Sequence, residues 1–333
     1  MAHDAFVLAA GLGTRLRPLT DHRPKPLVPV CGVPMLSYAL ALCARHGLTD
    51  VVVNAHHLAS QFDAWAGEHE GCEVTISTEL PDILGTGGGL AHVKDALAER
   101  FAVVNADVLC DVDLTALLAL VKEGGASMAL RPNAEDAVKF GVVGADNTST
   151  VVLLTDLASA PAASDIARET HFTGIHAMSR STLGLVPEGF ACIVRTAYRT
   201  LVPQRKVRSL RHEGTWLDVG DPAAYLTANL AVLTTTMPLP LDPLSRATFA
   251  ITPRGNVGNT PRHVEVEGCV WVGQDARLDR GSFLKDSIVG NGARIRAGAR
   301  LTRCVVWEGR DVPAGDWTDA IFYDGGYHKV EQK

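Results

Sequence analysis

The sequence predicts an α/β domain followed by a small parallel β-helix, and two observations carry this prediction. Short apolar runs alternate with helical patterns between residues 5 and 131. Such alternation is typical of a Rossmann-like, mostly parallel mixed sheet flanked by helices. Near the C-terminus, aliphatic residues recur about every six positions, a repeat that indicates a parallel β-helix.

The elements of the first region are expected in regular order. Strands are expected at residues 5–10, 50–54, 72–78, 101–105 and 127–131. Helices are expected at residues 35–45, 57–69, 89–100 and 114–122. After about residue 140 the alternation weakens, and the runs 141–143, 151–154 and 171–178 indicate a mixed insertion beside the main sheet. A helix over 222–233 would close this domain.

The C-terminal repeat places one aliphatic residue in each step. These residues are Val272, Leu278, Leu284, Val289, Ile295, Leu301, Val306 and Val312. In a parallel β-helix each hexad forms one short face of a coil, and its aliphatic side chain points inward. The proline-rich segment before the repeat has few periodic signals, which favours a linker. The predicted parts are a catalytic domain over 1–236, a linker over 237–262 and a β-helix domain over 263–333.

Composition argues against several classes of protein. The formal net charge is −6 and long basic runs are missing, so we expect no nucleic-acid partner. The 7 cysteines are scattered without a C-x-x-C pair, which favours free thiols in a reducing cytoplasm. The N-terminal residues do not follow the signal-peptide pattern, and no apolar run reaches the ~20 residues of a membrane span. We therefore expect no membrane association.

A glycine-bearing loop directly follows the first expected strand. Gly11 and Gly13 precede Thr14 and Arg15, and Lys25 lies ten residues further on, between two prolines. Glycines let the backbone N–H groups approach a triphosphate. An arginine adds a forked donor and a lysine adds a point charge. The combination predicts a phosphate-binding site.

The run Gly11-Leu12-Gly13-Thr14-Arg15, with Lys25 in Pro-Lys-Pro-Leu, resembles the signature of the sugar-1-phosphate nucleotidylyltransferases. Mannose-1-phosphate guanylyltransferases and N-acetylmuramate-1-phosphate uridylyltransferases are similar members, and the resemblance covers residues 5–235. It implies an enzyme that joins a nucleoside triphosphate to a sugar 1-phosphate and releases pyrophosphate. Arg15 would then stabilise the leaving pyrophosphate, and Lys25 would bind the phosphates. The implied nucleotide contacts in this loop are Leu8, Ala10, Gly11, Gly13 and Thr14.

Two aspartates complete the implied catalytic set. Asp107 lies just beyond the strand 101–105, and Asp218 lies in the run Trp-Leu-Asp-Val-Gly. Both are expected at the carboxyl ends of strands, where open α/β sheets bind ligands. The resemblance implies that they hold Mg²⁺, a hard cation that prefers oxygen ligands and substrate phosphates. The alternative is that each aspartate serves as a helix cap or turn residue.

A second loop, Leu84–Gly89, resembles the family segment that contacts the base and ribose, which implies contacts from Gly85 and Thr86. Glu79 lies where uridylyl- and thymidylyltransferases often carry glutamine. An ionised carboxylate only accepts hydrogen bonds, and guanine presents two adjacent N–H donors, so Glu79 favours GTP. The alternative is a solvated residue at the end of a strand, and UTP stays open.

Two further segments resemble sugar contacts, one at Gly141 and one at Thr173-Gly174. Many family members carry Glu-Lys-Pro after the first of these strands, whereas this chain has Leu154-Thr155-Asp156-Leu157-Ala158. The missing lysine leaves the sugar undecided between mannose, heptose, glucose and N-acetylmuramate.

The charged residues of the predicted site also distinguish an active enzyme from a non-catalytic relative. A non-catalytic relative that binds nucleotide sugar and regulates a partner would lose these charges, whereas Arg15, Lys25, Asp107 and Asp218 are all present. The hexad tail resembles the C-terminal left-handed β-helix of GDP-mannose and ADP-glucose pyrophosphorylases. Its length gives too few coils for an acyltransferase, so we expect it to form homo-oligomers. The tryptophans among the hexads, Trp271 and Trp307, are expected to cover the coil or a subunit contact.

Overall fold

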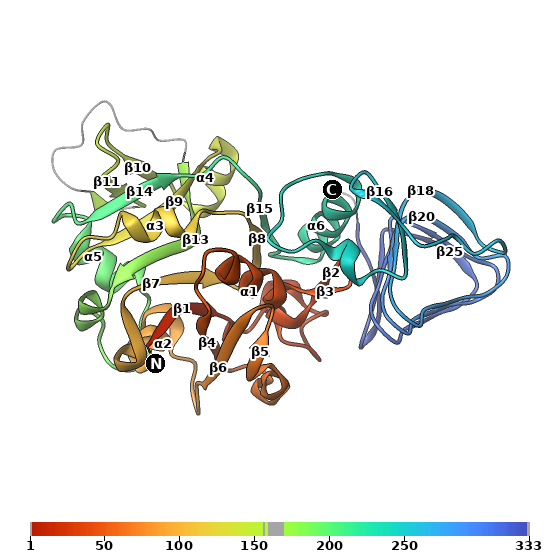
Figure 1. The fold of residues 1–333 in the computed structure, drawn as a ribbon, viewed down its shortest axis with the longest axis horizontal. Helices are drawn as coiled ribbons and strands as arrows, with labels where there is room; N and C mark the ends of the chain where they lie inside the picture. Colours follow the sequence, from red (N-terminus) through yellow and green to blue (C-terminus); the bar gives the residue numbers. More distant parts are fainter. Residues whose placement is uncertain (1, 156, 159–169, 332–333) are drawn as a thin grey trace. The chain divides into compact units, whose positions relative to one another are not determined.

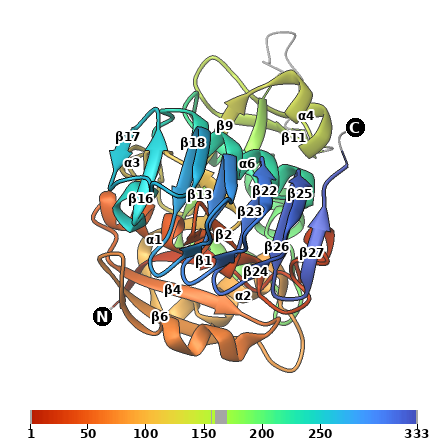
Figure 2. The same ribbon diagram turned by 90° about the vertical axis from the view of Figure 1, so that its right-hand side faces the viewer.

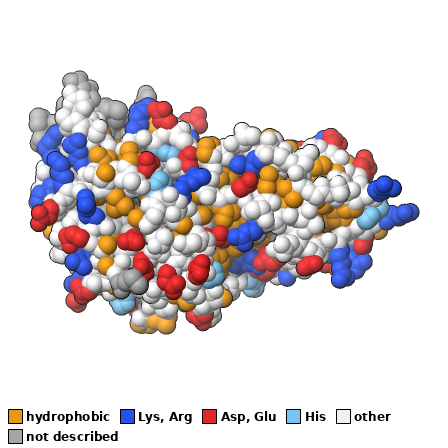
Figure 3. Space-filling view, viewed as in Figure 1, with side chains coloured by type: hydrophobic (Ala, Val, Ile, Leu, Met, Phe, Trp, Pro, Cys, Tyr) orange, Lys and Arg blue, Asp and Glu red, His pale blue; other side chains and the backbone are white. Residues whose placement is uncertain are grey.

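The computed structural model describes residues 2–155, 157–158 and 170–331, which form two compact units. The first unit comprises Met1–Gly11 and Ala39–Trp216, and the second comprises Leu12–Tyr38 and Leu217–Lys333. Within the described ranges, none of the helices has the length and apolar character that crossing a bilayer requires. All seven cysteines are free thiols. On the face shown in Figure 3, acidic and basic side chains are interspersed.

The first unit is built on an eight-stranded sheet with the order β14-β9-β13-β7-β1-β4-β6-β5 (Figure 1). Its strands are β1 His3–Leu8, β4 Asp50–Ala55, β5 Gly67–His69, β6 Cys72–Thr78, β7 Leu97–Asn105, β9 Ala126–Pro132, β13 Thr170–Ser179 and β14 Val207–Arg211. The pairs β7-β1, β1-β4, β4-β6 and β14-β9 are parallel, whereas β13 and β5 run antiparallel to their neighbours. The predicted parallel-rich mixed sheet is confirmed.

Helices and a small second sheet surround these strands. The helices are α1 Met35–Arg45, α2 Gly85–His92, α3 Leu114–Ala119, α4 Ala134–Phe140 and α5 Arg199–Leu201. Helix α3 packs on β7, β9 and β13. The strands β10 Val143–Ala145, β11 Val151–Leu154 and β12 Leu157–Ala158 form the small antiparallel sheet expected from the weakened alternation.

The sequence prediction was wrong for two helices of this unit. Residues 57–69 form the 3₁₀ helix Ala59–Trp65 and then strand β5. The expected helix over 89–100 is replaced by α2, which ends at His92, and by β7, which begins at Leu97. Tertiary contacts override local helix propensity here: the α2 backbone is tied to Ala191, and Leu97 pairs with His3 of β1.

The second unit combines the segment Leu12–Tyr38 with one helix and a C-terminal β-rich region. Its N-terminal segment holds the short hairpin of β2 Pro29–Val30 and β3 Val33–Pro34. The strand β15 Trp216–Asp218 precedes helix α6 Pro222–Thr234. Residues 249–257, within the segment expected to be a linker, form the hairpin of β16 Phe249–Thr252 and β17 Gly255–Val257, which pairs with β18 Glu265–Val272.

Beyond β18 the strands of the C-terminal region pair in parallel over successive repeats, as β22 and β25 do in Figure 2. The strands are β19 Arg277–Leu278, β20 Phe283–Val289, β21 Arg294–Ile295, β22 Ala299–Thr302, β23 Val305–Val306, β24 Asp311–Val312, β25 Gly315–Thr318, β26 Ala320–Tyr323 and β27 Gly326–Lys329. Val272 pairs with Val289, and Val289 pairs with Val306, so partners lie 17 residues apart (289 − 272 and 306 − 289). That spacing equals three of the five- or six-residue steps of the repeat.

The aliphatic repeat forms the core of this region. All eight repeat residues from Val272 to Val312 are at most 9% exposed and belong to one buried cluster. The inward orientation expected from the repeat is therefore confirmed. Trp271 and Trp307 are also buried, at 1% and 0% exposure, inside the second unit itself.

Candidate active site

The glycine turn of the predicted phosphate site lies in the second unit. Gly13 has a φ of +63°, in the left-handed region that favours glycine, and it precedes the 3₁₀ helix Thr14–Leu16. Its carbonyl accepts a hydrogen bond of 2.8 Å from the Thr20 hydroxyl. A Cβ atom on Gly13 would lie only 3.2 Å from Cβ of Lys25. The turn and the stem of Lys25 are therefore packed together.

Lys25 begins a short 3₁₀ helix, Lys25–Leu27, and is only 7% exposed. Pro24 before it has an extended backbone, and Pro26 follows it inside the helical turn. Proline restricts the backbone on both sides of the lysine. Because the dielectric constant is low near a buried position, a cation held there interacts with a phosphate more strongly than one in water.

Arg15 and Asp218 meet at Gly220. A Cβ atom on Gly220 would lie 2.8 Å from Oδ2 of Asp218 and 3.4 Å from Nη1 of Arg15. Any larger residue at position 220 would displace one of these charged groups. The second unit thus brings four predicted site residues into two pairs, Gly13 with Lys25 and Arg15 with Asp218 through Gly220.

The first unit carries Leu8, Ala10, Gly11 and Asp107 at one edge of its sheet. Leu8 of β1 pairs with Asn105 of β7, and Leu8 O accepts a hydrogen bond of 3.1 Å from Ala106 N. Because β1 and β7 are parallel, their carboxyl ends lie at the same edge. Ala10 and Gly11 follow β1 there, and Asp107 follows β7 in a turn. This is the edge at which open α/β sheets bind ligands.

Sequence reasoning missed Asn54, which connects this edge to the second glycine loop. Asn54 in β4 is 2% exposed, and its Oδ1 accepts hydrogen bonds from Ala9 N at 2.6 Å and Ala10 N at 3.2 Å. Its Nδ2 donates to Oε1 of Glu79 at 2.7 Å. The only sequence signal was an asparagine near the end of the apolar strand Asp50–Ala55.

Glu79 continues the same network and is 1% exposed, so it is not the solvated strand-end residue of one interpretation. Its Oε2 accepts a hydrogen bond of 2.7 Å from Leu84 N, at the entrance to α2. A Cβ atom on Gly89 would lie 2.5 Å from Glu79 Oε1, so glycine is required there for close approach. Both carboxylate oxygens therefore accept from the protein itself.

The second glycine loop forms the start of α2 and is tied to the segment around Ala191. Gly87 N donates to Ala191 O at 2.8 Å, and Thr86 Oγ1 accepts from Ile193 N at 3.0 Å. Gly85 begins the helix with no side-chain cap. An N–H group at a helix N-terminus is available to a ligand unless another acceptor takes it, as Ala191 O takes those of Gly87 and Gly88.

The predicted sugar residues lie on β13 and at the end of α4. A Cβ atom on Gly174 would lie 2.5 Å from Nδ2 of Asn105, the last residue of β7. Thr173 is buried, and its hydroxyl donates to Ala129 O at 2.9 Å. Gly141 ends α4, and the next residue, Val142, bridges to β13 at His171. Thr173 and Gly174 are thus beside the strand that leads to Asp107, and Gly141 is adjacent to β13.

Comparison with known proteins decides the family. A family model described as nucleotidyl transferase matches residues 4–235 of the chain. The chain belongs to the nucleotidyl transferase family. The matched span includes every site residue discussed above.

Several relatives of this nucleotidyltransferase are similar over most of its length. The mannose-1-phosphate guanylyltransferase of Mycobacterium tuberculosis is 29% identical over 320 residues, which cover 94% of this chain and 82% of the relative. The UTP–glucose-1-phosphate uridylyltransferase of Synechocystis is 26% identical over 91% of this chain and 82% of the relative. The mannose-1-phosphate guanyltransferase of Candida albicans is 30% identical over 69% of this chain and 64% of the relative.

The donor set of the nucleotidyltransferase suits a divalent cation held partly by substrate. Among residues 2–155, 157–158 and 170–331 there is no cluster of three or more histidine, cysteine or acidic side chains with metal-binding geometry. Mg²⁺ does not need such a cluster, since it is usually bound by one or two carboxylates together with waters and substrate phosphates. Asp107 of the first unit and Asp218 of the second are the carboxylates that the sequence predicts for this role.

Proposed function

We propose that this nucleotidyltransferase joins a nucleoside triphosphate to a sugar 1-phosphate and releases pyrophosphate and an NDP-sugar. The observation that carries the proposal is the packing of the buried Lys25 against the left-handed turn at Gly13. A cation beside a turn of exposed backbone N–H groups is a site for a phosphate chain. The sugar 1-phosphate relatives named above support the choice of acceptor.

In the proposed reaction, an oxygen of the sugar phosphate attacks the α-phosphorus of the nucleotide, and the bond from that phosphorus to the pyrophosphate oxygen breaks. Such transfers depend on positioning and charge stabilisation, so they require no protein nucleophile. Lys25 binds the phosphates at the reacting centre, and Arg15 stabilises the charge that develops on the leaving pyrophosphate. Asp107 and Asp218 would hold Mg²⁺, which supplies charge neutralisation when bound.

The proposed nucleotide contacts are Leu8, Ala10, Gly11, Gly13, Thr14, Gly85 and Thr86, and the proposed sugar contacts are Gly141, Thr173 and Gly174. For Glu79 we propose that it acts on the nucleotide by holding the two loops rather than by touching the base. Its hydrogen bonds to Asn54 and Leu84 N support this role. The preference for GTP then rests on the guanylyltransferase relatives and no longer on the Glu79 carboxylate.

We propose GTP and mannose 1-phosphate as the substrates, with UTP and a hexose or N-acetylmuramate 1-phosphate as the alternative. The two guanylyltransferase relatives favour the first pair, and the Synechocystis uridylyltransferase favours the second. A grid of nucleoside triphosphates against sugar 1-phosphates, with Mg²⁺ present, tests both by pyrophosphate release. The expected outcome is the fastest release with GTP and mannose 1-phosphate. Binding of an NDP-sugar without release in any pair would contradict the enzyme and favour a regulatory subunit.

We also propose that residues 263–333 form a left-handed β-helix, joined by residues 237–262 to a catalytic domain over 1–236. The parallel pairing at 17-residue spacing and the buried aliphatic core support the β-helix. A cytoplasmic homo-oligomer formed through this β-helix completes the proposal. Light scattering of the intact chain tests the assembly, and a monomer at micromolar concentration would contradict it.

A further inference from the structure

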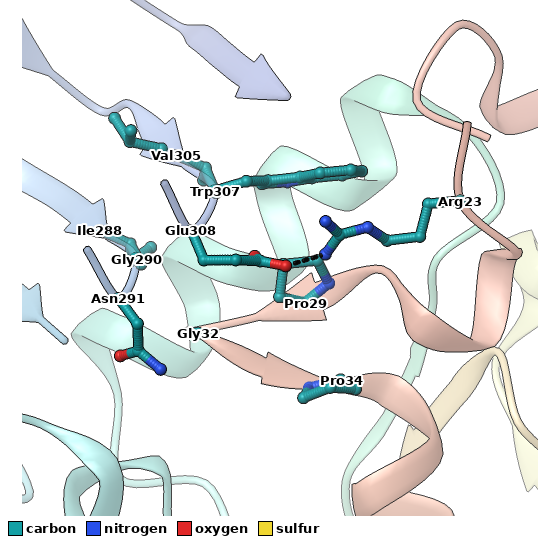
Figure 4. A pocket seen from close by; sticks show the side chains of 11 residues that line it. Arg23, Pro29, Gly32, Pro34, Ile288, Gly290, Asn291, Val305, Trp307 and Glu308 are labelled. Carbon is teal, nitrogen blue, oxygen red and sulfur yellow. Dashed lines mark ion pairs between the residues drawn. The ribbon is translucent and has the colours of Figure 1, made fainter. Parts of the chain in front are cut away.

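The segment that carries Lys25 is held by the C-terminal β-rich region, first at Arg23. Nε and Nη2 of Arg23 donate to the two carboxylate oxygens of Asp324 at 3.0 and 3.1 Å. Nη1 lies 2.5 Å from Oε1 of Glu308, and the dashed line in Figure 4 marks this ion pair. The guanidinium lies over the ring of Trp307, with Cζ 4.5 Å from the ring centroid. The Arg23 side chain is 15% exposed, so these contacts fix a largely desolvated cation.

A second anchor holds the same segment on the other side of Lys25. The Trp307 indole N–H donates to the Tyr225 hydroxyl at 2.8 Å, and that hydroxyl donates to Pro29 O at 2.6 Å. Burial raises the pKa of Tyr225 above its ordinary value. The phenol therefore stays protonated and remains a donor. Trp307 thus contacts the segment twice, once under Arg23 and once through Tyr225.

A third anchor lies at the tip of the hairpin formed by β2 and β3. Cys31 N donates to Asn229 Oδ1 at 2.9 Å, from helix α6. Gly32 has a φ of +70°, and a Cβ atom there would lie 2.1 Å from the Trp271 ring. Only glycine fits this position. The two tryptophans of the hexad region therefore contact the Lys25 segment within the chain.

Between these anchors the packing is incomplete. A cavity of about 190 Å³ separates Pro29 and Pro34 of the hairpin from Asn291 of the β-rich region (Figure 4). A cavity contributes no dispersion contacts across its width. Residues 24–31 are nevertheless all buried, so the segment is held by this packing together with the anchors on its two sides.

We propose that the C-terminal β-rich region is a positioning part of the catalytic machinery: it fixes residues 23–32 and thereby the place of Lys25. The inference rests on the proposed role of Lys25 in phosphate binding. Arg23 is two residues before the lysine and Pro29 is four residues after it, so both ends of a short 3₁₀ turn are tied. A shift of about 1 Å in a catalytic group can cost about 100-fold in rate.

We call the contacts of Arg23 with Asp324 and Glu308 the clamp. The first test removes the negative charge of its two carboxylates. The variants are Asp324→Asn, Glu308→Gln and the double variant, all nearly isosteric. We expect kcat to fall about tenfold in each single variant and about 100-fold in the double variant, by the same misplacement argument. The matched control is Asp311→Asn, which breaks the two-bond pair with Arg296 in the same region, distant from residues 23–32 in the chain. Its kcat should equal that of the wild type, and an equal loss there would overturn the inference.

A second test asks whether the clamp acts through Lys25. In a Lys25→Ala background, Asp324→Asn should produce no further loss of kcat, because the group it positions is gone. Full loss in that background would overturn the proposal. Amide hydrogen exchange over residues 24–32 supplies a readout without substrate: it should become faster in the double variant and stay unchanged in Asp311→Asn. If exchange over residues 24–32 is the same in the double variant as in the wild type, the clamp is overturned, even if the enzyme is active. If exchange is faster in the double variant but the wild type has no activity, only the proposed function is contradicted.

Discussion

Two loops that the sequence marks for ligand binding are held in opposite ways. The α2 loop of the first unit depends on the buried carboxylate of Glu79, which accepts from neutral amides. The Lys25 segment of the second unit depends on Arg23, whose acidic partners are partly exposed, 47% for Glu308 and 22% for Asp324. A buried network of hydrogen bonds is rigid and costly to break. An ion pair near water is weaker and is screened by salt. The first loop is therefore held by a buried network alone, whereas the acidic partners in one anchor of the second reach water.

The largest expected effect is the loss of kcat when a charged site residue of either unit is removed. Lys25→Ala in the second unit and Asp107→Ala in the first should each lower kcat about 1,000-fold, the scale for loss of one preorganised charge in a transition state. Circular dichroism should show that both variants keep the fold. The exposed Lys122 provides a control, and Lys122→Ala should leave kcat unchanged. Near-normal rates in either site variant would contradict the assigned role.

The next largest effect is on the free energy of unfolding, when the buried hydrogen-bond network around Glu79 is broken. Glu79→Ala leaves the Asn54 amide and Leu84 N without their acceptor, so the free energy of unfolding should fall by about 3 kcal/mol. Glu79→Gln restores one acceptor and should lose about half as much. Urea denaturation measures both. Glu73→Ala, at an exposed position of β6, the strand that ends just before Glu79, should stay within about 0.5 kcal/mol of the wild type. A change that small in Glu79→Ala would show that the network does not hold the loop.

The smallest expected effect is a difference between the two loops in how their amide exchange responds to salt. At 1 M salt the Debye length falls to about 3 Å, which weakens the exposed side of the Arg23 clamp. Amide exchange over residues 24–32 should become a few-fold faster, whereas exchange over residues 84–89 should not change. The Asp324→Asn, Glu308→Gln variant should lose this salt response. An equal response in both loops would remove the distinction between them.

Local patterns predicted much of the first unit and of the repeat. The bounds of α1 and β6 agree with the expected ranges, since apolar periodicity and flanking glycine and proline are local signals. The helices predicted at 57–69 and 89–100 are wrong because backbone groups distant in the sequence pair with these segments. Ala191, for example, forms hydrogen bonds with the start of α2. Glu79 was singled out for its chemistry, but its burial could not be foreseen from its neighbours in the sequence.

The sequence by itself determined the chemistry that the chain can offer: the glycine turn, the flanking cations, and the aliphatic repeat that forms the C-terminal core. Each of these is encoded within a few consecutive residues, where backbone freedom, charge and periodicity can be recognised. Only the tertiary structure decided how the loops are held. Arg23 and Asp324 are 301 residues apart and Asn54 and Glu79 are 25 apart. Partners so distant leave no local pattern, because their contact exists only after the strands and coils have packed.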